Sequence, residues 1–360
     1  GIAVPGVPLN AEPAKVINLS LGGYSPCGPA LQQAVNDVRA RGVVIVAATG
    51  NDAAMGAGAP ANCSGVIGVT AHTPEGDSAD YANVGTGTML SAPGGGRGVL
   101  MTGSQLSVLS TVNLGTTTPT GSGYGLKTGT SIAAPHVTGV AAMLLSENAS
   151  LTPDDIASLL TQSARPFPAG SWCQSRPGTC GAGMLDADSA LALLSGQPVV
   201  HVAASADTVQ PGATLTLYAK GAPGFKVSGA TIQWSQTAGP AVSITPVTSD
   251  SSGATAVLPT AGTYSFVATI RNDAGSVATD TVTVAATAPA SASPGSSETS
   301  NGSPGGSDSG ASPPPAGGGT GGMASQAGGS GGGGAISPVL ALLLLFAGGL
   351  GYGLRNSRSA

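Results

Sequence analysis

Residues 127–142 read Lys-Thr-Gly-Thr-Ser-Ile-Ala-Ala-Pro-His-Val-Thr-Gly-Val-Ala-Ala and place Ser131 just ahead of a long apolar run. Pro135 falls where the first helical turn is expected, and proline is tolerated there because its missing N–H loses no intrahelical partner. The apolar residues that follow leave almost no polar face, which predicts a helix buried on every side. A serine at the start of such a helix faces free N–H groups and the positive end of the helix dipole, which favour an anion. A simple Gly-Thr-Ser cap on a core helix is the alternative.

The composition is that of a small-residue chain with little charge. Its 360 residues include 58 glycines, 8% charged residues and 3% aromatic residues. The net charge of −5 comes without a basic stripe, which argues against nucleic acid as a partner. Because the composition is uneven along the chain, the length overstates the folded part.

The four cysteines are Cys27, Cys63, Cys173 and Cys180, and they form no Cys-x-x-Cys pattern, so a zinc site is not expected. An even number suggests two disulfides, and we favour Cys27 with Cys63 and Cys173 with Cys180. Three pairings are formally possible, and free buried thiols are the alternative. Two disulfides fit an extracellular protein, which needs a signal peptide. The chain opens Gly-Ile-Ala-Val-Pro without such a leader, and we therefore expect a fragment of a longer precursor.

The first half of the chain alternates strand and helix signals. Val16–Leu21 and Val43–Ala48 are short apolar runs typical of strands buried in a parallel sheet. Between them, Pro29–Ala40 has helical spacing of apolar residues, which completes a strand, helix, strand unit of an α/β domain. Residues 66–70 predict a further strand. The stretch 152–155, Thr-Pro-Asp-Asp, predicts a helix start, with a threonine cap, proline in the first turn and acids that complement the dipole.

Beyond residue 198 the pattern changes to short runs of alternating threonine, valine and tyrosine, broken by Pro-Gly and Asn-Asp-Ala-Gly turns. This pattern predicts an all-β sandwich over residues 199–286. Trp234 is expected to anchor its core, and a carbohydrate-stacking role is the alternative. The predicted strands are 214–219, 231–236, 254–258, 262–270 and 276–284.

The C-terminal part predicts a linker and a membrane segment. Residues 287–334 are almost only Gly, Ser, Pro, Ala and Thr, which bury too little apolar area to offset chain entropy, so we expect a disordered linker. Residues 335–354 carry no charged residue and are long enough to cross a membrane as a transmembrane helix. Arg355 and Arg358 in the basic tail 355–360 are expected to stay in the cytoplasm under the positive-inside rule. The folded domains are therefore expected on the outer side of the membrane.

Three segments together resemble the second half of a subtilisin-like serine peptidase, a subtilase. They are residues 16–23 (Val-Ile-Asn-Leu-Ser-Leu-Gly-Gly), 46–52 (Val-Ala-Ala-Thr-Gly-Asn-Asp) and 128–136 (Thr-Gly-Thr-Ser-Ile-Ala-Ala-Pro-His). The resemblance covers residues 1–195, where the stretch 181–187 looks like the closing segment of the family. It implies a partial three-layer α/β domain with a parallel sheet, and it supports the disulfide pairing favoured above.

Carried over to this chain, the resemblance implies that Ser131 is the nucleophile of peptide-bond hydrolysis. Asn51 and the Ser131 N–H would then donate to the oxyanion that forms during acyl transfer. The implied substrate pocket has two walls, Ser20-Leu21-Gly22, which pairs with the substrate backbone, and Ala48-Thr49-Gly50 opposite. Asp52 would favour a basic residue before the scissile bond. A plain turn at residues 50–52 is the alternative for Asn51.

The base that a serine nucleophile needs is not evident in this sequence. In the family the Asp and His precede the serine. His136 lies on the helix of the serine, His72 follows a strand in what reads as a surface turn, and His201 opens the sandwich. We therefore expect the Asp and His upstream of Gly1, and we expect this chain alone to hydrolyse peptides poorly.

The second half of the chain carries two further resemblances. Residues 199–286 look like a PKD-type immunoglobulin-like domain. The tail from Gly331 looks like a GlyGly-CTERM sorting signal, which implies cleavage by a rhomboid-like sorting protease; a permanent membrane anchor is the simpler alternative.

Together these features predict an exported serine endopeptidase at the cell surface or outside the cell, acting on protein or peptide substrates. The membrane would be a partner through the C-terminal span. No cofactor is expected to be required, and structural calcium is common in the family, but Asp77 and Asp80 read as solvated loop charges. The alternative function is a surface adhesion or binding protein with an inactive peptidase-like domain.

Overall fold

The structure is a computed structural model that describes residues 5–8, 10–100, 105–249 and 251–288. The predicted linker beyond residue 288, the predicted span 335–354 and the tail 355–360 lie outside these residues. Among the residues that are described, none of the helices has the length and apolar character needed to cross a membrane.

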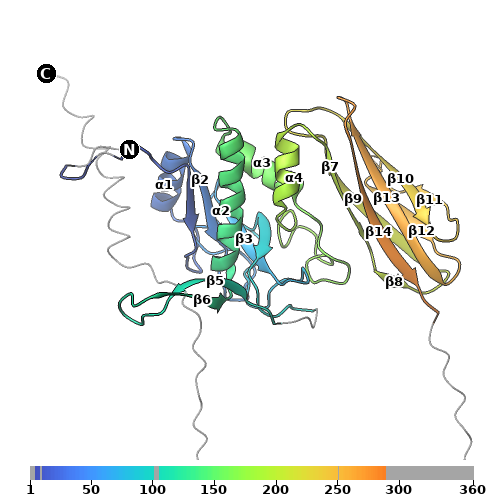
Figure 1. Ribbon diagram of the computed structural model, residues 1–360, viewed down its shortest axis with the longest axis horizontal. Coiled ribbons are helices and arrows are strands. Elements are labelled where there is room, and N and C mark those ends of the chain that lie inside the picture. The colour runs from blue at the N-terminus through green and yellow to red at the C-terminus, as the bar shows by residue number, and fades with distance from the viewer. Residues whose placement is uncertain (1–4, 9, 101–104, 250, 289–360) are drawn as a thin grey trace, which may run out of the picture.

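A parallel sheet of four strands organises the N-terminal half, with the order β1-β2-β3-β4 (Figure 1). The strands are β1 (Val16–Leu19), β2 (Val44–Ala48), β3 (Ile67–His72) and β4 (Leu90–Pro93). The prediction of a parallel sheet is confirmed, and its first three strands were predicted. The last strand was not, because Leu-Ser-Ala-Pro is too short and too polar to stand out as an apolar run.

Helices cover both faces of this sheet. Successive side chains of a strand point to opposite faces, and every residue of β2 is buried. Val46 packs in the same apolar cluster as the buried side of α2 (Thr130–Glu147), whereas Ile45 and Ala47 pack in the cluster of α1 (Pro29–Arg39). A strand buried on both sides explains why its sequence is a continuous apolar run.

Helix α2 differs from its prediction in two respects. It begins at Thr130, so Pro135 is an interior residue and not part of the first turn. It is also not buried on every side, because Pro135, Gly139, Ala142 and Met143 are exposed, Met143 to 45%. Its buried residues follow helical spacing and face the sheet. Because nearly all residues of the helix are apolar, the sequence does not show that only one side of it is buried.

The remaining elements of this half were only partly predicted. Helix α3 (Pro153–Ser163) has the predicted cap, since the Thr152 hydroxyl accepts from Asp155 N–H at 3.1 Å and the Asp155 carboxylate accepts from Thr152 N–H at 2.9 Å. Helix α4 was not predicted, nor was the antiparallel hairpin that leads into α2 (Figure 1). These elements are α4 (Ala187–Leu194), β5 (Val108–Asn113) and β6 (Ser122–Lys127).

The C-terminal half contains two packed four-stranded sheets, ordered β10-β13-β14-β8 and β11-β12-β9-β7 (Figure 1). Five of these strands overlap the five predicted ones. The strands are β7 (Val199–Ala204), β8 (Thr208–Val209), β9 (Thr214–Ala222), β10 (Ala230–Ala238), β11 (Ile244–Pro246), β12 (Gly253–Val257), β13 (Gly262–Asn272) and β14 (Val277–Ala286).

Trp234 is not the central anchor of the sandwich that the sequence predicted. It is only partly buried, and its indole N–H donates to the Ser251 carbonyl at 2.8 Å. Tyr264 and Phe266, both on β13 and both fully buried, are the largest side chains of the core. Trp234 lies on the face of β10 that packs against the core, but β10 is the edge strand of its sheet, so its inward face is covered less completely than that of the central strand β13.

Both disulfides have the favoured pairing. Cys27 is bonded to Cys63 beside α1, and Cys173 is bonded to Cys180 within the segment between α3 and α4. The first joins residues 36 apart and the second joins residues 7 apart. The longer loop restricts the unfolded chain more.

A lysine of the sandwich fastens the two halves together. The Lys220 ammonium on β9 donates to the carbonyl oxygens of Thr161, Ala164 and Ala182 at 2.7, 2.9 and 2.8 Å. Two of these carbonyls lie at the C-terminal end of α3, where the helix leaves carbonyls unpaired and its dipole favours a cation. Burial lowers the pKa of Lys220 to about 8. The charge is thus held at some cost in desolvation.

We predict that Lys220→Met lowers the free energy of unfolding of the chain by about 1–3 kcal/mol, because three carbonyl oxygens, two of them in part-buried contacts, lose their charged donor. Lys15→Met, at an exposed lysine, should change it by less than about 0.5 kcal/mol. Urea unfolding followed by circular dichroism measures both. Equal stability of the two variants would show that the three bonds of Lys220 contribute nothing.

Candidate active site

Ser131 lies at the rim of a cavity of about 250 Å³ that three separate segments enclose. The structure brings together all the residues predicted for the site. The lining residues are Ser20, Leu21, Gly22, Gly23, Tyr24, Ala48, Thr49, Gly50, Asn51, Asp52, Thr130 and Ser131. Gly23, Tyr24 and Thr130 line it in addition to the predicted residues.

The topology of the sheet explains why these segments meet. β1 and β2 are parallel neighbours, so the residues that follow them emerge at the same edge of the sheet. Helix α2 begins at that edge, directly after β6 of the hairpin (Figure 1). Two strand ends and a helix N-terminus therefore surround one point. Polar groups placed there are held by regular secondary structure.

Pro135 explains one contact of the site that the sequence did not reveal. Proline has no N–H, so the carbonyl oxygen of Ser131, four residues earlier, has no donor within its own helix. The Ser20 hydroxyl donates to that oxygen at 2.7 Å. The end of β1 is thereby bound to the first turn of α2. Ser20 was predicted only as a wall of the pocket.

The Asn51 side chain is fixed at its oxygen. Asn51 Oδ1 accepts from the Thr130 N–H and from the Thr130 hydroxyl, both at 2.9 Å. With the oxygen occupied in this way, the amide nitrogen is the end that remains to donate into the cavity. Thr130 precedes Ser131, so the same helix turn orients the amide and carries the serine.

Gly129 keeps open the space between these two groups. It has φ +142°, and a Cβ added to it would lie 2.9 Å from Ser131 Oγ and 3.4 Å from Asn51 Nδ2. A point beside Gly129 is therefore within reach of both atoms. A reacting carbonyl group needs such a position, next to a nucleophile and an N–H donor at once.

Two residues that support the Asn51 loop were missed in the sequence. Asn83 is fully buried, and its Oδ1 accepts from the N–H groups of Asp52 and Ala54 at 2.9 and 3.0 Å. Its Nδ2 donates to the Asp52 carboxylate at 3.0 Å. Tyr81, two residues earlier, contacts the same loop and also Gly129. No spacing in the stretch 80–85 marks these contacts, because both partners lie on distant segments.

The histidines do not reach Ser131. His136 bonds the Ile132 carbonyl on its own helix at 2.9 Å, and His201 bonds the Ser163 carbonyl at 2.9 Å. His72 is not in a surface turn as predicted. It is 6% exposed at the end of β3, with Nδ1 2.9 Å from the Ser91 hydroxyl on β4. The adjacent strand β4 covers it, which the local sequence does not indicate.

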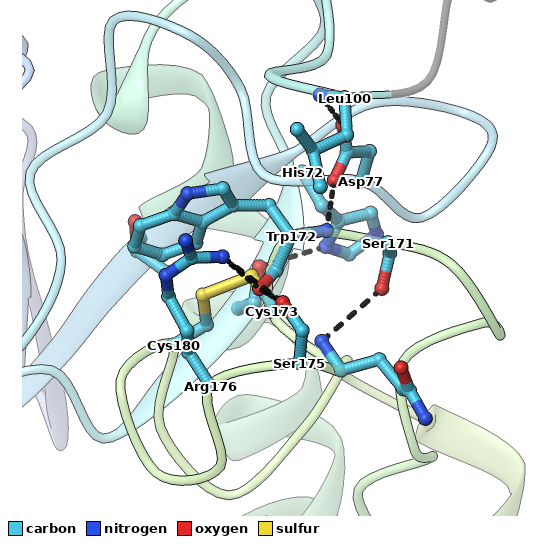
Figure 2. Close-up of a disulfide and its surroundings, with 12 residues drawn as sticks. His72, Asp77, Leu100, Ser171, Trp172, Cys173, Ser175, Arg176 and Cys180 are labelled. Atoms are coloured by element: carbon cyan, nitrogen blue, oxygen red, sulfur yellow. Dashed lines mark hydrogen bonds between the residues drawn. A yellow bond between two sulfur atoms is a disulfide. The ribbon is translucent and has the colours of Figure 1, made fainter. Parts of the chain in front are cut away.

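Asp77 also differs from its prediction, because it is buried instead of solvated. Its carboxylate accepts from the Trp172 N–H at 2.7 Å and from the Leu100 N–H at 2.6 Å, beside the Cys173–Cys180 disulfide (Figure 2). It ties this disulfide loop to the residues after β4. In the described ranges of the chain, no group of three or more His, Cys, Asp or Glu side chains is arranged to hold a metal ion.

Asp80 is ion-paired with Arg97 at 3.1 Å, and its side chain is 37% exposed. It therefore lies at the surface, as the sequence suggested, but with a partner.

Comparisons with known proteins show which proteins this chain is similar to. Residues 6–187 match the sequence profile of the Subtilase family. A protein named "Extracellular protease" from Xanthomonas campestris pv. campestris is 45% identical over 193 residues, which are 53% of this chain and 30% of that protein. An "Extracellular basic protease" from Dichelobacter nodosus is 37% identical over 169 residues, 46% of this chain and 26% of that protein.

The chain thus spans less than a third of the length of these two relatives. Among solved structures, a protease from Pseudoalteromonas arctica PAMC 21717 is 42% identical, with a TM-score of 0.47. The match covers 53% of this chain and 54% of the other.

Burial makes the stability of the fold depend on the protonation of His72. Desolvation, with smaller contributions from Arg165 and His136, lowers the pKa of His72 from 6.5 to about 3. The folded chain keeps this ring neutral, whereas the unfolded chain protonates it below pH 6.5. The free energy of unfolding therefore decreases as the pH falls from 6.5 to about 3.

We predict that the advantage of the wild type over His72→Asn in free energy of unfolding shrinks by about 2 kcal/mol between pH 7 and pH 5, since one pKa unit corresponds to about 1.4 kcal/mol. Asparagine keeps a polar group near Ser91 and does not titrate. Urea unfolding of both chains at the two pH values tests this. A difference independent of pH would mean that His72 does not control the acid sensitivity.

Proposed function

The chain belongs to the Subtilase family, and from this we propose that the protein of which it forms part is an exported serine endopeptidase. The observation that carries the proposal is the shared space beside Gly129, within reach of both Ser131 Oγ and Asn51 Nδ2. In the proposed reaction, Ser131 Oγ loses its proton to a base and attacks the carbonyl carbon of a peptide bond; the C–N bond then breaks, the amine leaves with that proton as the first product, and an acyl-enzyme remains. Water then hydrolyses this ester and releases the second product.

The proposed oxyanion site has three components, one from the segment after β2 and two from the start of α2. Negative charge develops on the carbonyl oxygen of the substrate as Ser131 attacks. Asn51 Nδ2 and the Ser131 N–H are donors in fixed positions for this oxygen, and the positive end of the α2 dipole lies beside it. Thr130 holds Asn51 Oδ1, so little reorganisation is needed when the charge appears.

We place the general base and its orienting acid on segments outside this chain. A neutral serine hydroxyl is a weak nucleophile and needs a base to accept its proton. The cavity lining includes no histidine, and all three histidines of the chain bond other groups. The proposed complete enzyme therefore needs an additional Asp and His.

Substrate binding is proposed to follow the walls of the cavity. Residues 20–22 extend from β1 at the edge of the sheet, where an extended peptide can add as a further strand. Backbone hydrogen bonds of this kind do not depend on substrate sequence, so they suit varied proteins. Residues 48–50 form the opposite wall. The pocket between the two walls is proposed to select among the side chains of the substrate.

Asp52 is the proposed determinant of substrate charge. Its side chain lines the cavity next to Asn51 and its carboxylate accepts from Asn83 Nδ2, which fixes its position. An exposed carboxylate at this point attracts a Lys or Arg side chain of the substrate. The attraction is modest because solvent screens it.

The other parts of the chain are proposed to serve location and spacing. The two disulfides and the names of the relatives support a location outside the cytoplasm. We propose that residues 199–286 are a PKD-type immunoglobulin-like accessory module, and that the C-terminal segment is a sorting signal removed by a rhomboid-like protease. The reaction itself is proposed to need no cofactor.

The catalytic proposal predicts that Asn51→Ala in the complete protein lowers kcat for peptide substrates by about 10²- to 10³-fold, the size typical for loss of one oxyanion donor. Asn36→Ala on the exposed side of α1 removes the same amide elsewhere and should leave kcat unchanged. A fluorophosphonate probe should label Ser131 in the wild type, as mapped by peptide mass spectrometry. Folded complete protein without label at Ser131 would favour the binding-protein alternative.

The specificity proposal predicts that Asp52→Asn lowers the ratio of kcat/KM for Lys over Phe before the scissile bond by about fivefold, the size of a screened surface charge interaction. Asparagine retains an oxygen that accepts from Asn83. Asp37→Asn, exposed on α1, changes the net charge equally and should leave the ratio unchanged. Identical ratios in wild type and Asp52→Asn would remove Asp52 from the pocket.

A further inference from the structure

Tyr81 contacts both sides of the proposed catalytic site, although it does not line the cavity. It lies in the connection between β3 and β4. Its hydroxyl accepts from the Gly129 N–H at 3.0 Å and lies 2.9 Å from the carbonyl oxygens of both Gly94 and Gly95, to which it donates. Its own carbonyl oxygen accepts from the Ala53 N–H at 2.8 Å.

Two of the partners of Tyr81 flank the two functional residues. Gly129 is the N-cap of α2 and lies two residues before Ser131, whereas Ala53 lies two residues after Asn51. Ala53 has φ +52°, a conformation that is strained in a residue with a Cβ and persists only where the surroundings enforce it. The Tyr81 carbonyl supplies part of that enforcement, and the Tyr81 hydroxyl holds the backbone of Gly129, a residue that is itself free to adopt many conformations.

The tyrosine ring is itself held in one place by glycines. A Cβ added to Gly96 would lie 2.7 Å from Tyr81 Cε1, and one added to Gly94 would lie 2.8 Å from the hydroxyl oxygen. The ring thus fits closely against a backbone without side chains. Burial raises the pKa of the hydroxyl above its ordinary value, so it stays protonated and able to donate.

We infer that Tyr81 is a positioning residue that sets the distance and orientation between Ser131 Oγ and Asn51 Nδ2. Its hydroxyl acts on Gly129 on the serine side, while its backbone carbonyl holds Ala53 on the asparagine side and so ties the two together, and it does not touch the substrate. This inference rests on the proposed peptidase function. Tyr81 is therefore expected to affect kcat and not KM, because a misplaced nucleophile and oxyanion donor raise the energy of the transition state without weakening substrate binding.

The test is Tyr81→Phe in the complete protein, which keeps the ring and removes one of the two acceptors of the Gly129 N–H, the other being the Gly94 carbonyl at 3.1 Å. We expect kcat for a peptide substrate to fall about tenfold, with KM within about twofold of the wild type. Tyr264→Phe is the matched control. It removes the hydroxyl of a fully buried tyrosine that donates to the Thr260 carbonyl at 2.8 Å in the sandwich, and it should leave kcat unchanged.

A double-mutant cycle separates positioning from a general loss of stability. If Tyr81 aligns Ser131 with Asn51, Tyr81→Phe should cost less than about twofold in kcat once Asn51→Ala has removed the donor. The same tenfold loss in both backgrounds would mean that Tyr81 acts independently of Asn51 and would overturn the inference. Unchanged kcat in Tyr81→Phe, with an active wild type, would overturn it as well.

A second measurement needs no turnover. In the chain described here, amide hydrogen exchange at Gly129 should be faster in Tyr81→Phe than in the wild type and unchanged in Tyr264→Phe. Unchanged exchange at Gly129 in Tyr81→Phe contradicts the inference even if the complete protein is active. A wild type that neither turns over peptides nor reacts at Ser131 contradicts the proposed function itself, and the inference with it.

Discussion

The carbonyl oxygen of Ser131 has no hydrogen-bond donor in its own helix, because Pro135 lacks an N–H, and the arrangement of the site depends on which group donates to it instead. The Ser20 hydroxyl donates to it at 2.7 Å, while the neighbouring Thr130 donates twice to Asn51 Oδ1. One helix turn is thus bound to the ends of two adjacent strands. The buried sheet is rigid, and these hydrogen bonds hold the polar groups of Ser131 and Asn51 in fixed positions relative to it.

Sequence reasoning succeeded where structure is local. The apolar runs that became β1 and β2 and the capping residues of α3 each act within a few neighbours, so their patterns could be interpreted directly. The site segments were found through their resemblance to one family. Each also follows a strand or begins a helix, and in parallel sheets such positions converge at one edge.

The sequence did not predict features in which segments distant along the chain determine burial or side-chain contacts. His72 and Asp77 lie among Thr, Pro, Glu and Gly and read as surface residues, yet β4 and the segment around Trp172 bury them. Trp234 was expected at the centre of the sandwich, but Tyr264 and Phe266 occupy that position. Tyr81 gave no local signal at all. Each of these outcomes depends on tertiary contacts that a local pattern does not encode.

The sandwich is attached to the α/β half by more than the chain connection. Lys220 reaches three carbonyl groups near the end of α3, and His201 reaches the Ser163 carbonyl. Val199 and Ala222 from the sandwich belong to the same apolar cluster as Leu193 of α4. These contacts extend the core of the α/β half into the sandwich.

We propose that the residues of this chain form the nucleophile and the oxyanion donors of a peptidase site. A crystal structure of the complete protein after reaction with a small phosphonylating inhibitor tests this directly. We expect a covalent bond from Ser131 Oγ to phosphorus, with the phosphonyl oxygen within hydrogen-bond distance of both Asn51 Nδ2 and the Ser131 N–H. An unmodified Ser131, or an adduct whose oxygen points away from Asn51, would contradict it.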